Sequence, residues 1–157
     1  MSDSINFELD RDRFNASNHE VMKFGRSLRQ FIDIRKIYCL VPLARSSERI
    51  ATGLSYMLVN SKGVDDNYAI VRPADVEVGS FRGLRSADLN GRFVICIDEP
   101  YDQRRAAVIE RSLAGLINFE NSERFAGGLY IGLDTGDIKI YEFDKTRVYR
   151  RANHTRV

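Results

Sequence analysis

The apolar residues of this chain follow two kinds of pattern, one with the spacing of a helix and one with the spacing of a strand. The clearest helical pattern covers residues 17–33, where Ser17 and Glu20 have the spacing of a capping box. Apolar residues then recur every three or four positions, at Val21, Phe24, Leu28, Phe31 and Ile32. This spacing places them on one side of a helix, so we predict a helix over 17–33.

Two further segments have apolar residues at helical spacing. Residues 101–120 follow Pro100, which the first turn of a helix tolerates, and their apolar residues share one face. Residues 46–62 show the same pattern less clearly, because Gly53 lowers the helix propensity of the segment. We predict a helix over 46–62, with a strand over 54–59 as the alternative.

Short runs of β-branched and aromatic residues, bounded by proline, glycine or polar residues, predict the strands. These runs cover residues 4–9, 35–43, 67–73, 74–81, 92–100, 129–133 and 138–143. The segment between the fourth and fifth runs, residues 82–91, is rich in residues that favour turns. We predict that it forms a loop.

The sequence Asp134-Thr135-Gly136 has three interpretations. A D-T-G turn carries the catalytic carboxylate of retroviral-type aspartic proteases, and a related glycine–Asp–glycine strand opens the phosphate-binding hairpin of actin-like kinases. Both architectures need much more chain after the motif than the 21 residues that follow Gly136. Alternating apolar residues on both sides, with a glycine that can adopt positive φ, are typical of a β-hairpin. We therefore predict a hairpin loop.

The predicted elements follow the order strand, helix, strand, helix, three strands, helix and two strands. They do not alternate regularly, and hairpins gather near the C-terminal end, which is typical of an α+β domain. We predict a single compact domain over residues 1–144. It would have a largely antiparallel sheet, about three helices packed on one face and a C-terminal β-hairpin. Residues 145–157 are predicted to form a basic C-terminal tail.

Composition and charge restrict the function classes. A net charge of +2 over 157 residues argues against a protein that coats nucleic acid with its whole surface, but leaves room for a local basic patch. No stretch approaches the roughly 20 apolar residues of a membrane helix, and the polar N-terminal segment lacks the apolar core of a signal peptide. We expect no membrane partner, and a protein that is cytoplasmic or incorporated into a particle assembled in the cytoplasm.

Cysteine and histidine usage offers little material for an active site. Cys39 and Cys96 lie in apolar strands without a C-x-x-C partner, so we predict buried free thiols. His19 lies in the first turn of a predicted helix, and His154 lies in the basic tail. These four residues do not make a recognisable zinc site, and we predict no cofactor and no metal.

Two adjacent carboxylates, Asp98 and Glu99, follow the most apolar strand and precede a helix. The dipole of that helix favours negative charge at its N-terminus, so a capping role alone explains the two carboxylates. The alternative is a metal-dependent phosphodiesterase or nuclease, in which Asp98 and Glu99, joined by Asp134 and Asp137, would begin a magnesium site.

The C-terminal tail carries basic residues and no acidic one after position 144, with one aromatic residue among them. The candidate binding residues are Lys145, Arg147, Tyr149, Arg150, Arg151 and Arg156. Further arginines that could join them on one basic side are Arg82, Arg85, Arg92, Arg104, Arg105 and Arg111. Charge of one sign suits docking on an acidic protein surface. With an interleaved tyrosine it equally suits phosphate contacts and base stacking.

The sequence therefore predicts an interaction protein more than an enzyme. The favoured function is a non-catalytic assembly component, such as a subunit of a virion or a secretion machine, that docks on a protein partner or self-associates through its arginine-rich tail. The acidic N-terminal segment (Asp3, Glu8, Asp10 and Asp12) adds to this expectation. A nucleic-acid-binding module using the same basic face is the first alternative, and the metal-dependent nuclease is the second.

Overall fold

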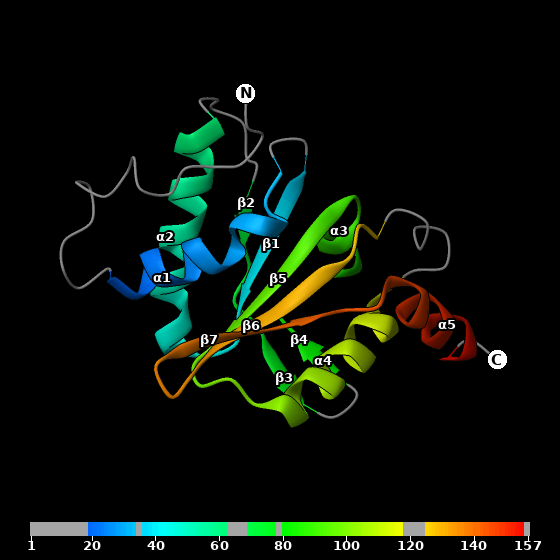
Figure 1. The fold of residues 1–157 in the computed structure, drawn as a ribbon. Coiled ribbons are helices and arrows are strands. Elements are labelled where there is room, and N and C mark those ends of the chain that lie inside the picture. The colour runs from blue at the N-terminus through cyan, green and yellow to red at the C-terminus, as the bar shows by residue number, and fades with distance from the viewer. Residues whose placement is uncertain (1–18, 34–35, 63–68, 78–79, 118–124, 156–157) are drawn as a thin grey trace.

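The structure, a computed structural model, is that of a mixed sheet covered on both faces (Figure 1). It describes residues 19–33, 36–62, 69–77, 80–117 and 125–155. The predicted strand over 4–9 and the predicted capping residue Ser17 lie outside the described residues.

The sheet has five strands in the order β2-β1-β5-β6-β7. The strands are β1 (Ile37–Pro42), β2 (Ala69–Val71), β5 (Arg92–Asp98), β6 (Gly128–Asp134) and β7 (Asp137–Glu142). β1 pairs in parallel with both β2 and β5, and β5 pairs in parallel with β6. β7 runs antiparallel to β6 and forms one edge of the sheet.

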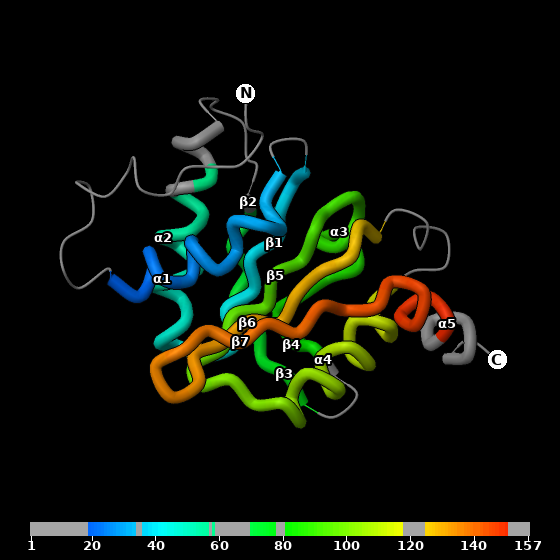
Figure 2. Tube along the Cα trace, viewed as in Figure 1, coloured from blue at the N-terminus to red at the C-terminus, as the bar shows by residue number. Residues whose placement is uncertain are grey.

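Helices α1 (His19–Leu28) and α2 (Arg45–Lys62) cover one face of the sheet, and the chain trace shows the two helices crossing each other (Figure 2). A single 3-10 turn, Arg29–Phe31, follows α1. Phe24 of α1, Leu54 of α2 and Ile95 of β5 meet in this layer of the core, each at most 1% exposed.

The other face is covered by helix α4 (Gln103–Leu116), helix α5 (Lys145–Thr155) and the segment between β2 and β5. That segment forms a small hairpin of β3 (Asp75–Glu77) and β4 (Ser80–Arg82), followed by the short helix α3 (Ser86–Leu89). Cys39 and Cys96 are fully buried in this layer as free thiols, as the sequence predicts. Burial raises the pKa of Cys39 to about 12.

The predicted α+β class and the C-terminal hairpin are confirmed. The sheet is mixed rather than largely antiparallel, because three of its four strand pairings are parallel. Helices also cover both faces of the sheet and not one, since β1 and β5 are apolar on both sides and each side must be buried. Within the predicted loop over 82–91, residues 86–89 form helix α3.

The segment over 46–62 is part of helix α2 and does not form the alternative strand. Gly53 allows this helix to pack closely against α1. A Cβ atom at Gly53 would lie 2.8 Å from Cγ1 of Val21 in α1, a distance that real side chains do not tolerate. The glycine lowers the intrinsic helix propensity of α2, but it allows α1 and α2 to pack closely.

The Asp134–Asp137 turn is the predicted hairpin loop, with Asp134 paired to Asp137 and two residues between them. Thr135 has φ of 46° and Gly136 has φ of 89°. Positive φ at both central residues defines a turn of type I′, which matches the twist of the two strands. Asp134 also accepts a salt bridge from Lys139 on the next strand, at 2.8 Å.

We predict that Thr135→Asn raises the free energy of unfolding by about 1 kcal/mol, because a β-branched residue is strained at positive φ and asparagine tolerates it. Urea denaturation of both proteins measures the difference. The matched control is Thr135→Val, which keeps the branched side chain and should give no gain. An unchanged midpoint for Thr135→Asn would contradict the prediction.

Candidate binding surface

The first part of the predicted tail, residues 145–155, is helix α5, and it packs against α4 (Figure 1). Asp144 begins the helix, since its Oδ1 accepts a hydrogen bond from the backbone N–H of Arg147 at 2.9 Å. Val148 is fully buried in the core. Residue Arg156 and the side chain of Arg151 lie outside the described part of the chain.

Arg147, a predicted docking residue, holds α5 to α4. Its Nε donates to Oε1 of Glu110 at 2.5 Å, and its Nη2 donates to Oε2 of the same carboxylate at 2.9 Å. The hydroxyl of Tyr141 in β7 accepts from Nη2 at 2.7 Å and donates to Oε2 of Glu110 at 3.2 Å. Glu110 is only 2% exposed, so the arginine neutralises a buried charge. This carboxylate in turn raises the pKa of Arg147.

Tyr149, the aromatic residue of the predicted tail, also has a structural contact. Its hydroxyl donates to the backbone carbonyl of Phe125 at 2.8 Å. Its ring stands edge-on to the ring of Phe125, with 6.2 Å between the centroids. The ring is therefore held against the domain and is not free to stack on a base.

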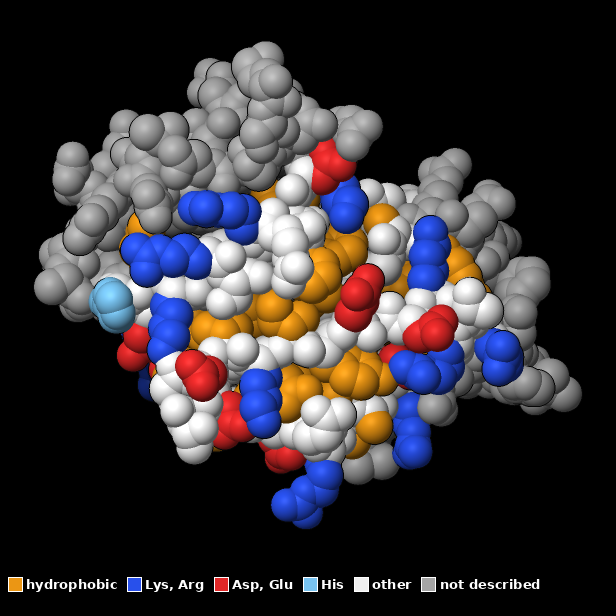
Figure 3. All heavy atoms as spheres, in the orientation of Figure 1, with side chains coloured by type: hydrophobic (Ala, Val, Ile, Leu, Met, Phe, Trp, Pro, Cys, Tyr) orange, Lys and Arg blue, Asp and Glu red, His pale blue; other side chains and the backbone are white. Residues whose placement is uncertain are grey.

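Four other cations remain on the outside of the two helices. Arg104 and Arg111 of α4 and Lys145 and Arg150 of α5 are exposed, and we call these four residues the basic face. Glu110 is the one carboxylate within α4 and α5, and Arg147 neutralises it. Figure 3 shows lysine and arginine side chains standing out from the surface where Figure 1 places these helices.

Sequence reasoning placed these cations on two segments, but it missed Glu110. This residue stands among the apolar positions of α4, next to Ile109 and three residues before Leu113. A charged residue on the buried side of a helix needs a partner of opposite charge. That position was the available signal that one arginine of the tail has a structural role.

We predict that Arg147→Ala lowers the Tm by several degrees, because it leaves the Glu110 carboxylate buried without its cation. The matched control is Arg150→Ala in the same helix, whose side chain is exposed, and its Tm should stay within about 2 °C of the parent protein. Differential scanning calorimetry measures both. Equal effects of the two substitutions would show that the ion pair does not stabilise α5.

Asp98 and Glu99, the acidic pair at the end of β5, are directed to opposite faces of the sheet. Asp98 is 1% exposed and belongs to the layer with α4. Its Oδ2 accepts from the hydroxyl of Tyr130 at 2.7 Å and from Nη1 of Arg105 at 3.1 Å. Its Oδ1 accepts from the backbone N–H of Glu99 at 2.9 Å. These hydrogen bonds satisfy the buried carboxylate within the domain.

The Glu99 side chain instead contacts the layer of α1 and α2, where it hydrogen-bonds with Glu20 and Ser46. Glu20 accepts a salt bridge from Nη2 of Arg49 at 2.8 Å. Burial raises the pKa of Glu99, and the adjacent Glu20 carboxylate raises it further. Glu99 therefore keeps its proton to a higher pH than an exposed glutamate does.

The pKa of Glu99 is higher in the folded protein than in the unfolded chain. Protonated Glu99 therefore contributes its full stabilisation of the fold at pH values below the unfolded pKa of glutamate. That contribution is lost as the pH rises through the folded pKa of Glu99. We predict that Glu99→Gln, which is permanently neutral, is more stable than the parent protein at pH 7, and that the two converge at acid pH. Urea denaturation at a series of pH values measures this. A constant difference between the two curves would contradict it.

The described residues contain no group of three or more histidine, cysteine, aspartate or glutamate side chains placed to hold a metal ion. The arrangement does not bring Asp98 and Glu99 together as metal ligands, and Asp134 is paired with Lys139 at the hairpin. Among the described residues, the four carboxylates of the nuclease interpretation are therefore not gathered into one metal site.

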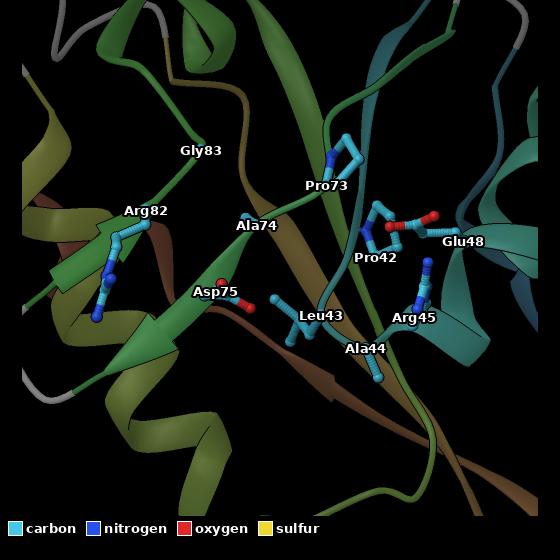
Figure 4. A pocket seen from close by; sticks show the side chains of 10 residues that line it. All are labelled: Pro42, Leu43, Ala44, Arg45, Glu48, Pro73, Ala74, Asp75, Arg82 and Gly83. Atoms are coloured by element: carbon cyan, nitrogen blue, oxygen red, sulfur yellow. The ribbon is translucent and has the colours of Figure 1, made fainter.

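A cavity of about 340 Å³ lies at the carboxyl ends of β1 and β2 (Figure 4). It is lined by apolar residues and by the charged residues Arg45, Glu48, Asp75 and Arg82. Arg82 points away from Arg45 in this view and forms an ion pair with Glu77. Two cations and two carboxylates give the lining no preference for a ligand of either charge, so the basic face remains the better-defined candidate.

None of the described helices has both the length and the hydrophobicity to cross a membrane. Comparisons of the chain with protein-family models, with curated proteins and with solved structures give no match.

Proposed function

We propose that the protein is a non-catalytic component of a larger assembly, and that it docks on an acidic protein surface through the basic face. Arg104, Arg111, Lys145 and Arg150 would supply the charge. Arg147 and Tyr149 would act as positioning residues, because both are bound within the domain. Arg151 and Arg156 extend the basic sequence beyond the described side chains.

One observation carries this proposal. Two helices from distant parts of the chain are fixed side by side, and their outer sides carry arginine and lysine. The one carboxylate within the helices, Glu110, is buried and neutralised, while Asp102 and Asp144 cap their first turns. A rigid surface with an excess of positive charge attracts an acidic partner and repels a basic one. Because a partly buried ion pair holds the helices together, little ordering is needed on binding, which favours affinity.

A protein partner is favoured over nucleic acid by the position of Tyr149. Non-specific binding of single strands combines a basic groove with aromatic rings on which bases stack. The ring of Tyr149 packs on Phe125, and its hydroxyl is bound to a backbone carbonyl. The basic face could still contact phosphates, so nucleic acid is the competing outcome of the test.

The test compares two fluorescent probes of equal length, a polyglutamate peptide and a single-stranded oligonucleotide, by fluorescence anisotropy over a series of salt concentrations. We expect the polyglutamate probe to bind. The double variant Arg111→Glu with Arg150→Glu should weaken that binding about tenfold, since an exposed charge contact contributes under about 1 kcal/mol. The matched control reverses two cations of the α1 layer, Lys23→Glu with Arg29→Glu, and should bind as the parent protein does.

Two results would overturn the proposal. In the first, the polyglutamate probe does not bind, or binds the Arg111→Glu/Arg150→Glu variant as well as the parent. In the second, the oligonucleotide binds more tightly than polyglutamate at every salt concentration, with a steep salt dependence, and the function becomes nucleic-acid binding.

A further inference from the structure

The outer edge of strand β7 is an interaction surface separate from the basic face. The register pairs Asp134 with Asp137 across a two-residue turn, and the backbone N–H of Phe143 donates to the carbonyl of Gly128 at 2.9 Å. In an antiparallel ladder the residues that exchange hydrogen bonds alternate along the strand. In β7 these are residues 137, 139 and 141, followed by Phe143. The backbone groups of Ile138, Ile140 and Glu142 are consequently directed away from β6.

This edge remains unpaired among the described residues, because β7 is the last strand of the sheet. It is also apolar on one side, where Ile138 and Ile140 are only partly buried against the core. Figure 3 shows a band of apolar side chains across the middle of the visible surface, where Figure 1 places β6 and β7. An unpaired strand of six residues with an apolar side is a template for pairing with another strand.

Proteins often protect such an edge with a lysine, and β7 has one at position 139. However, its Nζ lies 2.8 Å from Oδ2 of Asp134, in the same hairpin. The ion pair partly neutralises the lysine within its own chain. The edge is therefore less protected than the sequence Asp-Ile-Lys-Ile-Tyr-Glu suggests.

We propose that two copies of this chain pair through β7, antiparallel, with Ile140 opposite Ile140 of the second copy. This register uses the outward backbone groups of residues 138, 140 and 142 on both strands. It places Ile138 opposite Glu142 of the second copy, and Lys139 opposite the ring of Tyr141 of the second copy. The isoleucine pair and the lysine–tyrosine pairs are both favourable across strands. The result is one continuous ten-stranded sheet with a twofold axis.

The neighbouring registers are less favourable for a physical reason. A slip by one residue would turn the backbone groups of one strand away from the other. A slip by two residues toward the turn would set Lys139 opposite Lys139 of the second copy, and like charges directly opposite each other are destabilising. A slip by two in the other direction shortens the overlap of the two strands. The Ile140-centred register therefore has the best match of charge and length.

This pairing does not depend on the proposed docking function, because none of the residues of the basic face lies in β7. Charge reversal at Arg111 and Arg150 is therefore expected to leave the β7 pairing unchanged, which separates the two proposals experimentally.

The test uses the whole chain and measures its mass by light scattering after size-exclusion chromatography, over a dilution series. We expect twice the 18.0 kDa of one chain at the higher concentrations. Glu142→Pro should shift the protein toward the monomer, because the N–H that it removes faces the second copy and not β6. Circular dichroism and Tm check that this variant is folded. The Arg111→Glu/Arg150→Glu variant should keep the parent mass.

A cysteine scan on the same strand tests the register. In the proposed dimer the two Cα atoms at position 140 are about 5.5 Å apart, which a disulfide can bridge. Those at position 142 are about 14 Å apart, four residues along the strand, and are too distant to be bridged. Under mild oxidation Ile140→Cys should form a covalent dimer and Glu142→Cys should not. The native cysteines are fully buried and do not compete.

Three results would overturn the proposal. They are a monomer at every concentration, a covalent dimer for Glu142→Cys in place of Ile140→Cys, and a parent dimer that the Arg111→Glu/Arg150→Glu variant fails to form.

Discussion

Burial of strand β5 on both faces is the constraint on which the rest of the structure depends. All its residues from Phe93 to Asp98 are buried, and they alternate between the two layers of the core. A strand of this kind must have neighbours on both edges and cover on both faces. Its backbone groups are buried away from water and need hydrogen-bond partners, and its apolar side chains are unfavourable in water. The parallel pairings to β1 and β6 satisfy the backbone. The connections that parallel strands require then supply α2 to one face and α4 to the other.

The same constraint determines what the end of β5 can do. Side chains alternate along a strand, so two consecutive carboxylates that leave a buried strand are directed to opposite layers. Asp98 consequently contacts Arg105 and Tyr130, while Glu99 contacts Glu20 and Ser46. Carboxylates that share a metal ion must converge on one point, whereas these two side chains have partners in different layers. The pair in the sequence is thus two separate contacts, each of which joins a helical layer to the sheet.

Most elements could be predicted from the sequence, because apolar spacing determines local structure. The direction of the strands was also present in the sequence: β1 and β5 are apolar without alternation, and each is followed by a helix, which is typical of parallel pairing. The hairpins predicted near the C-terminus favoured an antiparallel sheet instead, and the sequence-based prediction followed them. Helix α5 could not be predicted in the same way. Its short apolar pattern is limited to Val148, Tyr149 and Ala152. Its contacts with the rest of the domain are made to Glu110 and Phe125, which are far away in sequence. Partners of this kind depend on tertiary structure.

Tyr141 connects the two surfaces of the protein. It lies in β7, and its hydroxyl joins the Glu110–Arg147 ion pair that fixes α5 on α4. The basic face and the β7 edge are therefore held in one relative orientation by a hydrogen-bonded group of three side chains. If two copies pair through β7, the twofold axis sets two basic faces at a defined separation. A partner with two acidic surfaces at that separation gains avidity without any new contact, whereas one at another spacing gains none. The rigidity of α5 would then contribute to partner selection as well as to stability.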